Sequence, residues 1–173
     1  MRFHLTERLR PHDAGILELG LIYNDWMGVP GGERKFDLSG TCVPACTGAG
    51  LPGPITVFGS QLHTHGAGRA VQTVVASPGS QQELLNRDPH YSTHFQEIRV
   101  LAAAVRVKPG DALITTCTYD TTDRTNITLG GQLPASACHT NTMDGEEQVH
   151  LCVHKICAAL SFVWVLLIQT SLS

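Results

Sequence analysis

Apolar and polar residues alternate along several short stretches of the chain. These stretches cover residues 16–23, 34–42, 54–63, 70–77, 97–111 and 112–120. A period of two is typical of strands with one buried face. Gly- and Pro-containing segments suited to tight turns separate them: "VPGGE", "GLPGP", "SPGS" and "KPGD". No convincing amphipathic helix interrupts the series. The pattern therefore predicts an all-β fold, an antiparallel β-sandwich of the jelly-roll type.

The pattern changes after Gly130-Gly131. From residue 132 the sequence shows neither strand alternation nor regularly spaced turns, and it ends in the apolar run "AALSFVWVLLI". We expect residues 1–131 to form a domain, and 132–173 to be a divergent, poorly structured tail. The predicted sandwich is therefore incomplete at its C-terminal end. The final run has about eleven apolar residues against the ~20 that a membrane-spanning helix needs, so we do not expect it to span a membrane.

Composition fits one globular domain. The chain has 173 residues, of which 42% are hydrophobic and 16% charged. Its net charge of −3 and its lack of a Lys/Arg cluster argue against nucleic acid as a partner. The opening "MRFHLTERLRPHDAG" is charged throughout and lacks the apolar core of ~7–15 residues found in a signal peptide.

Six cysteines, at positions 42, 46, 117, 138, 152 and 157, lack the CxxC spacing of a zinc ribbon. Asn126-Ile127-Thr128 is a sequon for N-glycosylation in a polar, turn-rich stretch. An even number of cysteines and a sequon favour a disulfide-bonded glycoprotein of the secretory pathway or the extracellular space. Because the chain opens without a signal peptide, we expect it to belong to a longer secreted protein.

His63 and His65 are separated by one residue in a predicted strand. Residues i and i+2 of a strand lie on the same face, so the two imidazoles can bind one ion of copper, zinc, iron or nickel. The alternative is that one histidine supports a hydrogen-bond network while the other lies on the surface. A cupin-like dioxygenase is disfavoured, because "HTHGAGRAVQ" has no carboxylate a few residues after the pair.

Longer blocks around this pair carry a family resemblance. "GSQLHTHGAGRAVQTVV", "LLNRDPHYSTHFQEIRVL" and "VKPGDALITTCTYDTTDRTNITLGG" follow one another in the order found in the copper type II ascorbate-dependent monooxygenases, dopamine β-hydroxylase-like branch. "LRPHDAGILELGLIYNDWMGVP" resembles the opening of that family's second catalytic domain, and the resemblance covers about residues 3–131. It implies a β-sandwich, and a copper- and ascorbate-dependent hydroxylation by molecular oxygen of a small amine-like substrate.

The resemblance also implies ligands. In the family, the oxygen-binding copper is held by two histidines and a methionine, and His63 and His65 match those histidines. Two imidazoles and a thioether suit Cu(I). The family's Met-Cys step after the Gly pair is not found here, and the nearest methionine is Met143, in the unrelated context "NTMDGEE". We therefore expect one copper at most, with Met143 as a candidate third ligand.

The disulfide candidates follow from the same resemblance. Cys42, Cys46 and Cys117 match cysteines that the family uses in disulfides. The expected partner of Cys117 falls in the divergent segment, where Cys138 is the nearest replacement.

The chain shows no counterpart of the family's first domain, whose three-histidine copper delivers an electron drawn from ascorbate. We therefore expect weak activity or none from this chain by itself. The alternative is a non-catalytic β-sandwich remnant or interaction module without copper.

The tail has two further interpretations. "HLCVHKIC" carries residues that could bind zinc (His150, Cys152, His154 and Cys157), or the tail comes from a shifted reading frame, a retained intron or an alternative exon.

Overall fold

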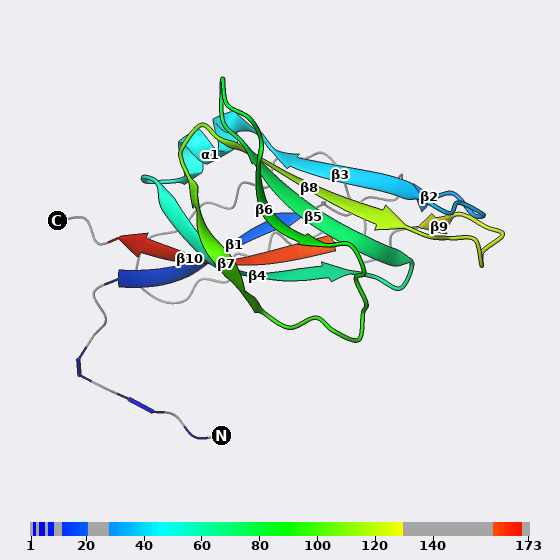
Figure 1. Ribbon diagram of the computed structural model, residues 1–173, viewed down its shortest axis with the longest axis horizontal. Helices are drawn as coiled ribbons and strands as arrows, with labels where there is room; N and C mark the ends of the chain where they lie inside the picture. Colours follow the sequence, from blue (N-terminus) through cyan, green and yellow to red (C-terminus); the bar gives the residue numbers. More distant parts are fainter. Residues whose placement is uncertain are drawn as a thin grey trace, which may run out of the picture.

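Two four-stranded antiparallel sheets form the body of the protein (Figure 1). The computed structural model describes residues 2, 4–5, 7–8, 12–20, 28–129 and 161–170. The first sheet contains, in spatial order, β1 (His12–Gly20), β10 (Ser161–Thr170), β4 (Ile55–Thr64) and β7 (Arg99–Val107). The second contains β3 (Phe36–Cys42), β8 (Ala112–Tyr119), β5 (Gly68–Ala76) and β6 (Glu83–Asp88). The predicted all-β antiparallel sandwich is thereby confirmed.

Three small elements complete the described part of the chain. Strands β2 (Gly28–Val29) and β9 (Thr128–Leu129) pair with each other, and α1 (Pro44–Gly50) follows β3. The sequence analysis did not predict this helix. Its seven residues "PACTGAG" are too few to show an apolar stripe, although a proline in its first turn is a common way to begin a helix.

The core lies between the two sheets because both contribute apolar side chains to one buried cluster. Strand β8 alternates between buried and partly exposed residues throughout, and β5 does so from Ala70 onward, with Val71, Val75 and Leu113 among the buried ones. Thr73 and Thr115 are also buried on this face, and their hydroxyl groups are hydrogen-bonded to each other at 3.1 Å. Burial of alternate side chains explains why the period of two located these strands.

The predicted turns recur between the strands, and three of them contain a glycine with positive φ: Gly32, Gly79 and Gly110. The turn between β7 and β8 shows why glycine is needed. Its Gly110 has a φ of 93°, in the region that L side chains rarely adopt. The Asp111 carboxylate, itself buried, accepts the backbone N–H of Lys108 at 2.8 Å and fixes the same turn.

Some predicted strands have different bounds in the structure, and some strands were not predicted. The first strand begins at His12 rather than residue 16, and β7 is shorter than the predicted 97–111. Strand β6, "ELLNRD", was not predicted because two adjacent leucines and charged ends hide its alternation.

Near the end of the chain, Ser161–Thr170 form β10 between β1 and β4. An apolar run without Gly or Pro suits a strand that has a neighbour on each side. The other residues of 131–173 lie outside the described ranges, so the predicted boundary at residue 131 stays a prediction. Among the described residues, no helix is long and apolar enough to span a membrane.

Candidate metal centre

The histidine pair lies where β4 ends. His63 is the penultimate residue of β4, its backbone is paired with Phe162 of β10, and His65 directly follows the strand. The centroids of the two imidazole rings are 5.2 Å apart, and the ring planes meet at 80°. Thr64 between them is fully buried and Leu62 packs against the core, so the histidines lie on the face of β4 that points away from the core. The predicted juxtaposition of the two rings is present.

Gln96 orients the first imidazole. The Nε2 group of its side-chain amide donates to the carbonyl oxygen of Thr93 at 2.6 Å, so Oε1 is the atom that contacts His63 Nδ1. Because an amide oxygen only accepts, Nδ1 carries the proton, and the lone pair of a neutral ring is then at Nε2. A metal-binding histidine is commonly held in this way, with one ring nitrogen donating to an oxygen while the other binds the metal.

A second glutamine connects β4 to the loop that carries Gln96. Gln61 lies two residues before His63 on the same face, and its Nε2 group donates to the backbone carbonyl of Gln96. Gln61 and His63 therefore both attach the Gln96 end of the loop between β6 and β7 to β4.

The buried residue between the histidines is held separately. The hydroxyl group of Tyr91 donates to the carbonyl oxygen of Thr64 and accepts its backbone N–H, each at 3.0 Å. Thr64 Oγ1 also donates to the Tyr119 hydroxyl at 3.3 Å. Burial raises the pKa of Tyr91, which keeps the phenol protonated and able to donate. Both flanking histidines thus project from a backbone unit with fixed hydrogen bonds.

The turn after the pair is also fixed. Gly68 donates its N–H to the carbonyl oxygen of His65 at 2.7 Å, and Arg69 Nη1 donates to the carbonyl oxygens of Gly66 and Gly68 at 2.8 and 2.9 Å. Arg69 in turn accepts the N–H of Tyr91 on its own carbonyl oxygen at 2.9 Å. Arg69 therefore stabilises the turn.

Electrostatics favour the neutral form of the second imidazole. Partial desolvation lowers the pKa of His65, and the neighbouring His63 lowers it further. Neutral imidazole is the form that binds metals, because protonation occupies the lone pair.

The donor set fits copper in part. Two imidazoles side by side supply two nitrogen ligands of the kind that copper accepts. Within the described ranges, no group of three or more His, Cys, Asp or Glu side chains comes together as a metal site. A third ligand from this chain would thus be a residue of another type or one outside those ranges, where Met143 lies.

Other predicted site residues can be located only in part. No disulfide bond joins Cys42, Cys46 or Cys117 to one another, and Cys138 lies outside the described residues. Asn126 is exposed in the loop before β9, a position that an oligosaccharide could occupy. The disulfide and glycosylation assignments stay predictions. Sequence reasoning missed Tyr91 and Gln96 as supports of the site, because neither residue type nor local spacing indicated their contacts.

The described part of the chain is thus a β-sandwich with two imidazoles side by side on the outer face of one sheet. Comparison with known sequences gives the family. Residues 12–143 match the family described as "Copper type II ascorbate-dependent monooxygenase, C-terminal domain", and the chain belongs to this family. The match runs past Gly131, where the resemblance was expected to end, and includes Met143.

Curated relatives agree with this assignment. The chain is 54% identical to dopamine beta-hydroxylase of Rattus norvegicus over 132 residues, which are 76% of this chain and 21% of the relative. It is 47% identical to tyramine beta-hydroxylase of Caenorhabditis briggsae over 131 residues, 75% of this chain and 22% of the relative. Identity to DBH-like monooxygenase protein 1 of Gallus gallus is 39% over 135 residues, with 76% and 22% covered. The chain spans about a fifth of the length of these relatives.

Proposed function

We propose that this chain forms the copper-binding part of a dopamine β-hydroxylase-like monooxygenase. The observation that carries the proposal is the pairing of His63 and His65, with ring centroids 5.2 Å apart, on a strand whose neighbours fix both residues. Family membership supplies copper as the metal and ascorbate as the reductant.

Each residue has a defined role in this proposal. His63 would bind copper through Nε2, because Gln96 holds the proton on Nδ1. His65 would supply the second nitrogen, and Met143 stays our candidate for the third ligand. When bound, copper would supply the dioxygen chemistry, in which R–H, O₂, two electrons and two protons give R–OH and water, with ascorbate as the electron source. The protein would hold the ligands in place, with Tyr91 and Gln96 as positioning residues.

The substrate and the compartment follow from the relatives and the sequence. Two relatives are named as hydroxylases of dopamine and of tyramine, so we propose a small amine as the substrate. The exposed sequon at Asn126, together with the cysteine content, supports a secretory or extracellular location.

A second candidate function is a non-catalytic sandwich or interaction module without copper. It is favoured by one observation: within the described ranges, no third His, Cys, Asp or Glu joins the histidine pair. Two imidazoles alone do not complete a copper site.

Copper content distinguishes the two candidates. The full chain would be loaded with copper and purified by gel filtration, beside His63→Ala and the control His90→Ala. His90 is exposed in the loop after β6. The monooxygenase proposal expects about one copper per chain in the wild type and in the control, and loss of copper in His63→Ala. Copper near zero in all three, from protein that is folded by circular dichroism, would support the non-catalytic module.

A further inference from the structure

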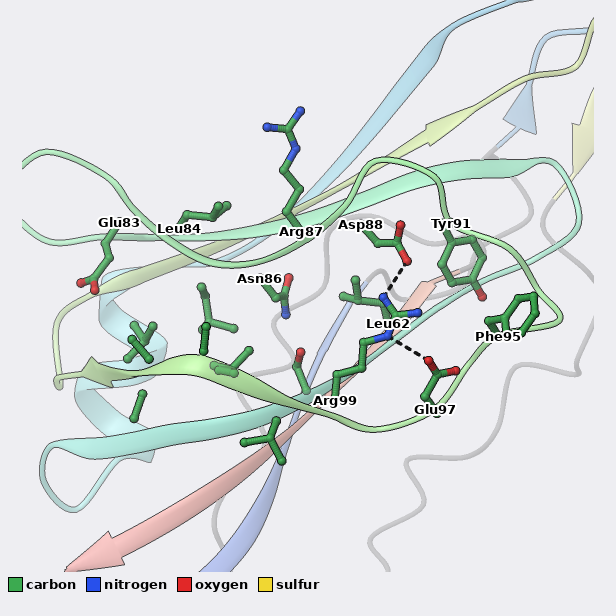
Figure 2. Close-up of a pocket in the computed structure, with 18 residues that line it drawn as sticks. Leu62, Glu83, Leu84, Asn86, Arg87, Asp88, Tyr91, Phe95, Glu97 and Arg99 are labelled. Carbon is green, nitrogen blue, oxygen red and sulfur yellow. Dashed lines mark hydrogen bonds and ion pairs between the residues drawn. The ribbon is translucent and has the colours of Figure 1, made fainter.

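A pocket of about 450 Å³ lies on the opposite side of β4 from the histidines. It lies between β6, at the edge of the second sheet, and β7, at the edge of the first sheet (Figure 2). Ser60 and Leu62 of β4 line its inner wall. Tyr91 and Phe95, from the loop between β6 and β7, close one end.

A large bulge in β7 makes room for the pocket. Val57 pairs with Val105 and Gly59 pairs with Val100, so Phe58 alone lies opposite Leu101–Ala104. Four residues against one bend β7 away from β4, and all four line the pocket. Three of them are alanines, whose short side chains leave the volume unfilled. Bulges of this kind often occur next to functional sites.

The wall of the pocket carries one polar side chain with unmet hydrogen-bonding capacity. Asn86 is 7% exposed, and neither its Nδ2 nor its Oδ1 atom has a hydrogen-bond partner in the described part of the chain. Figure 2 shows this side chain pointing from β6 toward β7 across the pocket. A buried amide without partners is rare in a folded protein and needs an explanation. The remaining lining near it is largely apolar, with Leu62, Leu85 and Leu101.

Charged side chains at the rim of the pocket restrict the charge of a ligand that can bind there. Arg99 is held by Asp88 at 3.2 Å and by Glu97 at 3.0 Å, as the dashed lines in Figure 2 show. Its guanidinium is thus already paired with carboxylates. Glu83 and Arg87, of opposite charge, also line the pocket, and Figure 2 shows the Arg87 side chain pointing away from β7. Three carboxylates against two guanidiniums give the lining a small excess of negative charge, which repels an anionic ligand and not a neutral one.

We propose that this pocket is a second binding site, for a small uncharged molecule with an apolar body and one carboxamide group. The carboxamide N–H would donate to Asn86 Oδ1, and its oxygen would accept from Asn86 Nδ2. The paired amide groups would satisfy both buried atoms at once, while the apolar body fills the space beside Leu101 and the alanines. The site uses neither histidine and does not rest on copper binding.

Benzamide is a suitable probe, with toluene and benzoate as matched controls that lack the amide or carry a negative charge. Binding to the ¹⁵N-labelled full chain would be followed by NMR. We expect saturable shifts of the Asn86 side-chain amide with benzamide, and at least tenfold weaker binding of both controls. Intermolecular nuclear Overhauser effects from benzamide to the Asn86 amide and the Leu101 methyl groups would identify the site in the wild type.

Asn86→Leu tests the amide directly. The variant removes both unmet polar atoms, so we expect it to fold, to lose at least tenfold in benzamide affinity and to retain toluene binding. Equal benzamide affinity in wild type and variant would overturn the proposal. So would the absence of saturable binding to the wild type, since water would then be the only occupant. Wild-type binding without contacts to Asn86 would also overturn it, whether or not the variant folds.

Discussion

The hydroxyl group of Tyr91 bridges the backbone N–H and the backbone carbonyl of Thr64, each at 3.0 Å. Strand β7 pairs with β4 only as far as Ser60, so the tyrosine hydroxyl satisfies backbone groups where the neighbouring strand has ended. Thr64 lies between the two histidines, and the bridge therefore fixes the segment from which both imidazoles project. Tyr91, which is 27 residues from Thr64 in the sequence, thus helps to position the candidate metal centre.

Tyr91→Phe should destabilise the fold and weaken metal binding. Loss of the hydroxyl leaves two buried backbone groups of Thr64 without this partner, which costs about 1–3 kcal/mol for each unsatisfied group. The free energy of unfolding in urea and the copper content of the folded variant would measure both effects. Tyr119→Phe is the matched control, because the hydrogen bond that the Tyr119 hydroxyl receives from Thr64 comes from a side chain and is longer, at 3.3 Å. Equal stability of the two variants would contradict the bridging role.

The same tyrosine predicts an alkaline limit to stability. Burial raises the pKa of Tyr91 above its usual value of about 10, so the folded state holds the phenolic proton more tightly than the unfolded chain does. Its contribution to stability is fully present below pH ~10 and is lost as the pH rises through the folded-state pKa. Urea unfolding between pH 8 and 11 should show stability falling more steeply above pH ~10 in the wild type than in Tyr91→Phe. Parallel curves would show that another group causes the loss.

Local patterns and distant contacts differ in how far the sequence reveals them. The alternation of "AVQTVVAS" and "ALITTCTYD" predicted β5 and β8 because each inward side chain is buried in one core. The histidine pair was found because a strand places residues i and i+2 on one face. Tyr91 contacts Thr64, between the two histidines, across 27 residues of chain, and Gln96 contacts His63 across 33 residues. No local period encodes such contacts. Strand β6 was missed because Leu84 and Leu85 are both apolar although only Leu85 is buried, so apolar and polar residues do not alternate along the strand.

Gly68→Ala should disturb the site through a steric clash. A Cβ atom at Gly68 would lie 2.1 Å from Thr64 Cγ2 and 3.1 Å from the carbonyl oxygen of His65. Thr64 is fully buried and has little room to move, so we expect a loss of about 1–3 kcal/mol in stability, as in other overpacked cores. Gly66→Ala is the matched control in the same turn, since a Cβ there meets nothing within 4 Å. Thermal or urea unfolding would compare them, and similar stabilities would rule out the clash.

Gln96→Ala should weaken copper binding without unfolding the protein. The substitution removes the oxygen that holds the proton on His63 Nδ1, so the ring can rotate or take the other tautomer. Loss of such a supporting hydrogen bond commonly costs 10–100-fold in metal affinity, here measured by competition with a chromophoric copper chelator. Gln82→Ala, at an exposed position before β6, is the control and should bind as the wild type does.

Gln96→Glu separates the two roles of the amide. A carboxylate still accepts the His63 proton but cannot donate to the carbonyl oxygen of Thr93. We expect Gln96→Glu to bind copper more tightly than Gln96→Ala, because orientation of the imidazole depends on the acceptor. If Gln96→Ala and Gln82→Ala bind copper equally well, Gln96 does not position His63, and the loop between β6 and β7 is a structural support alone.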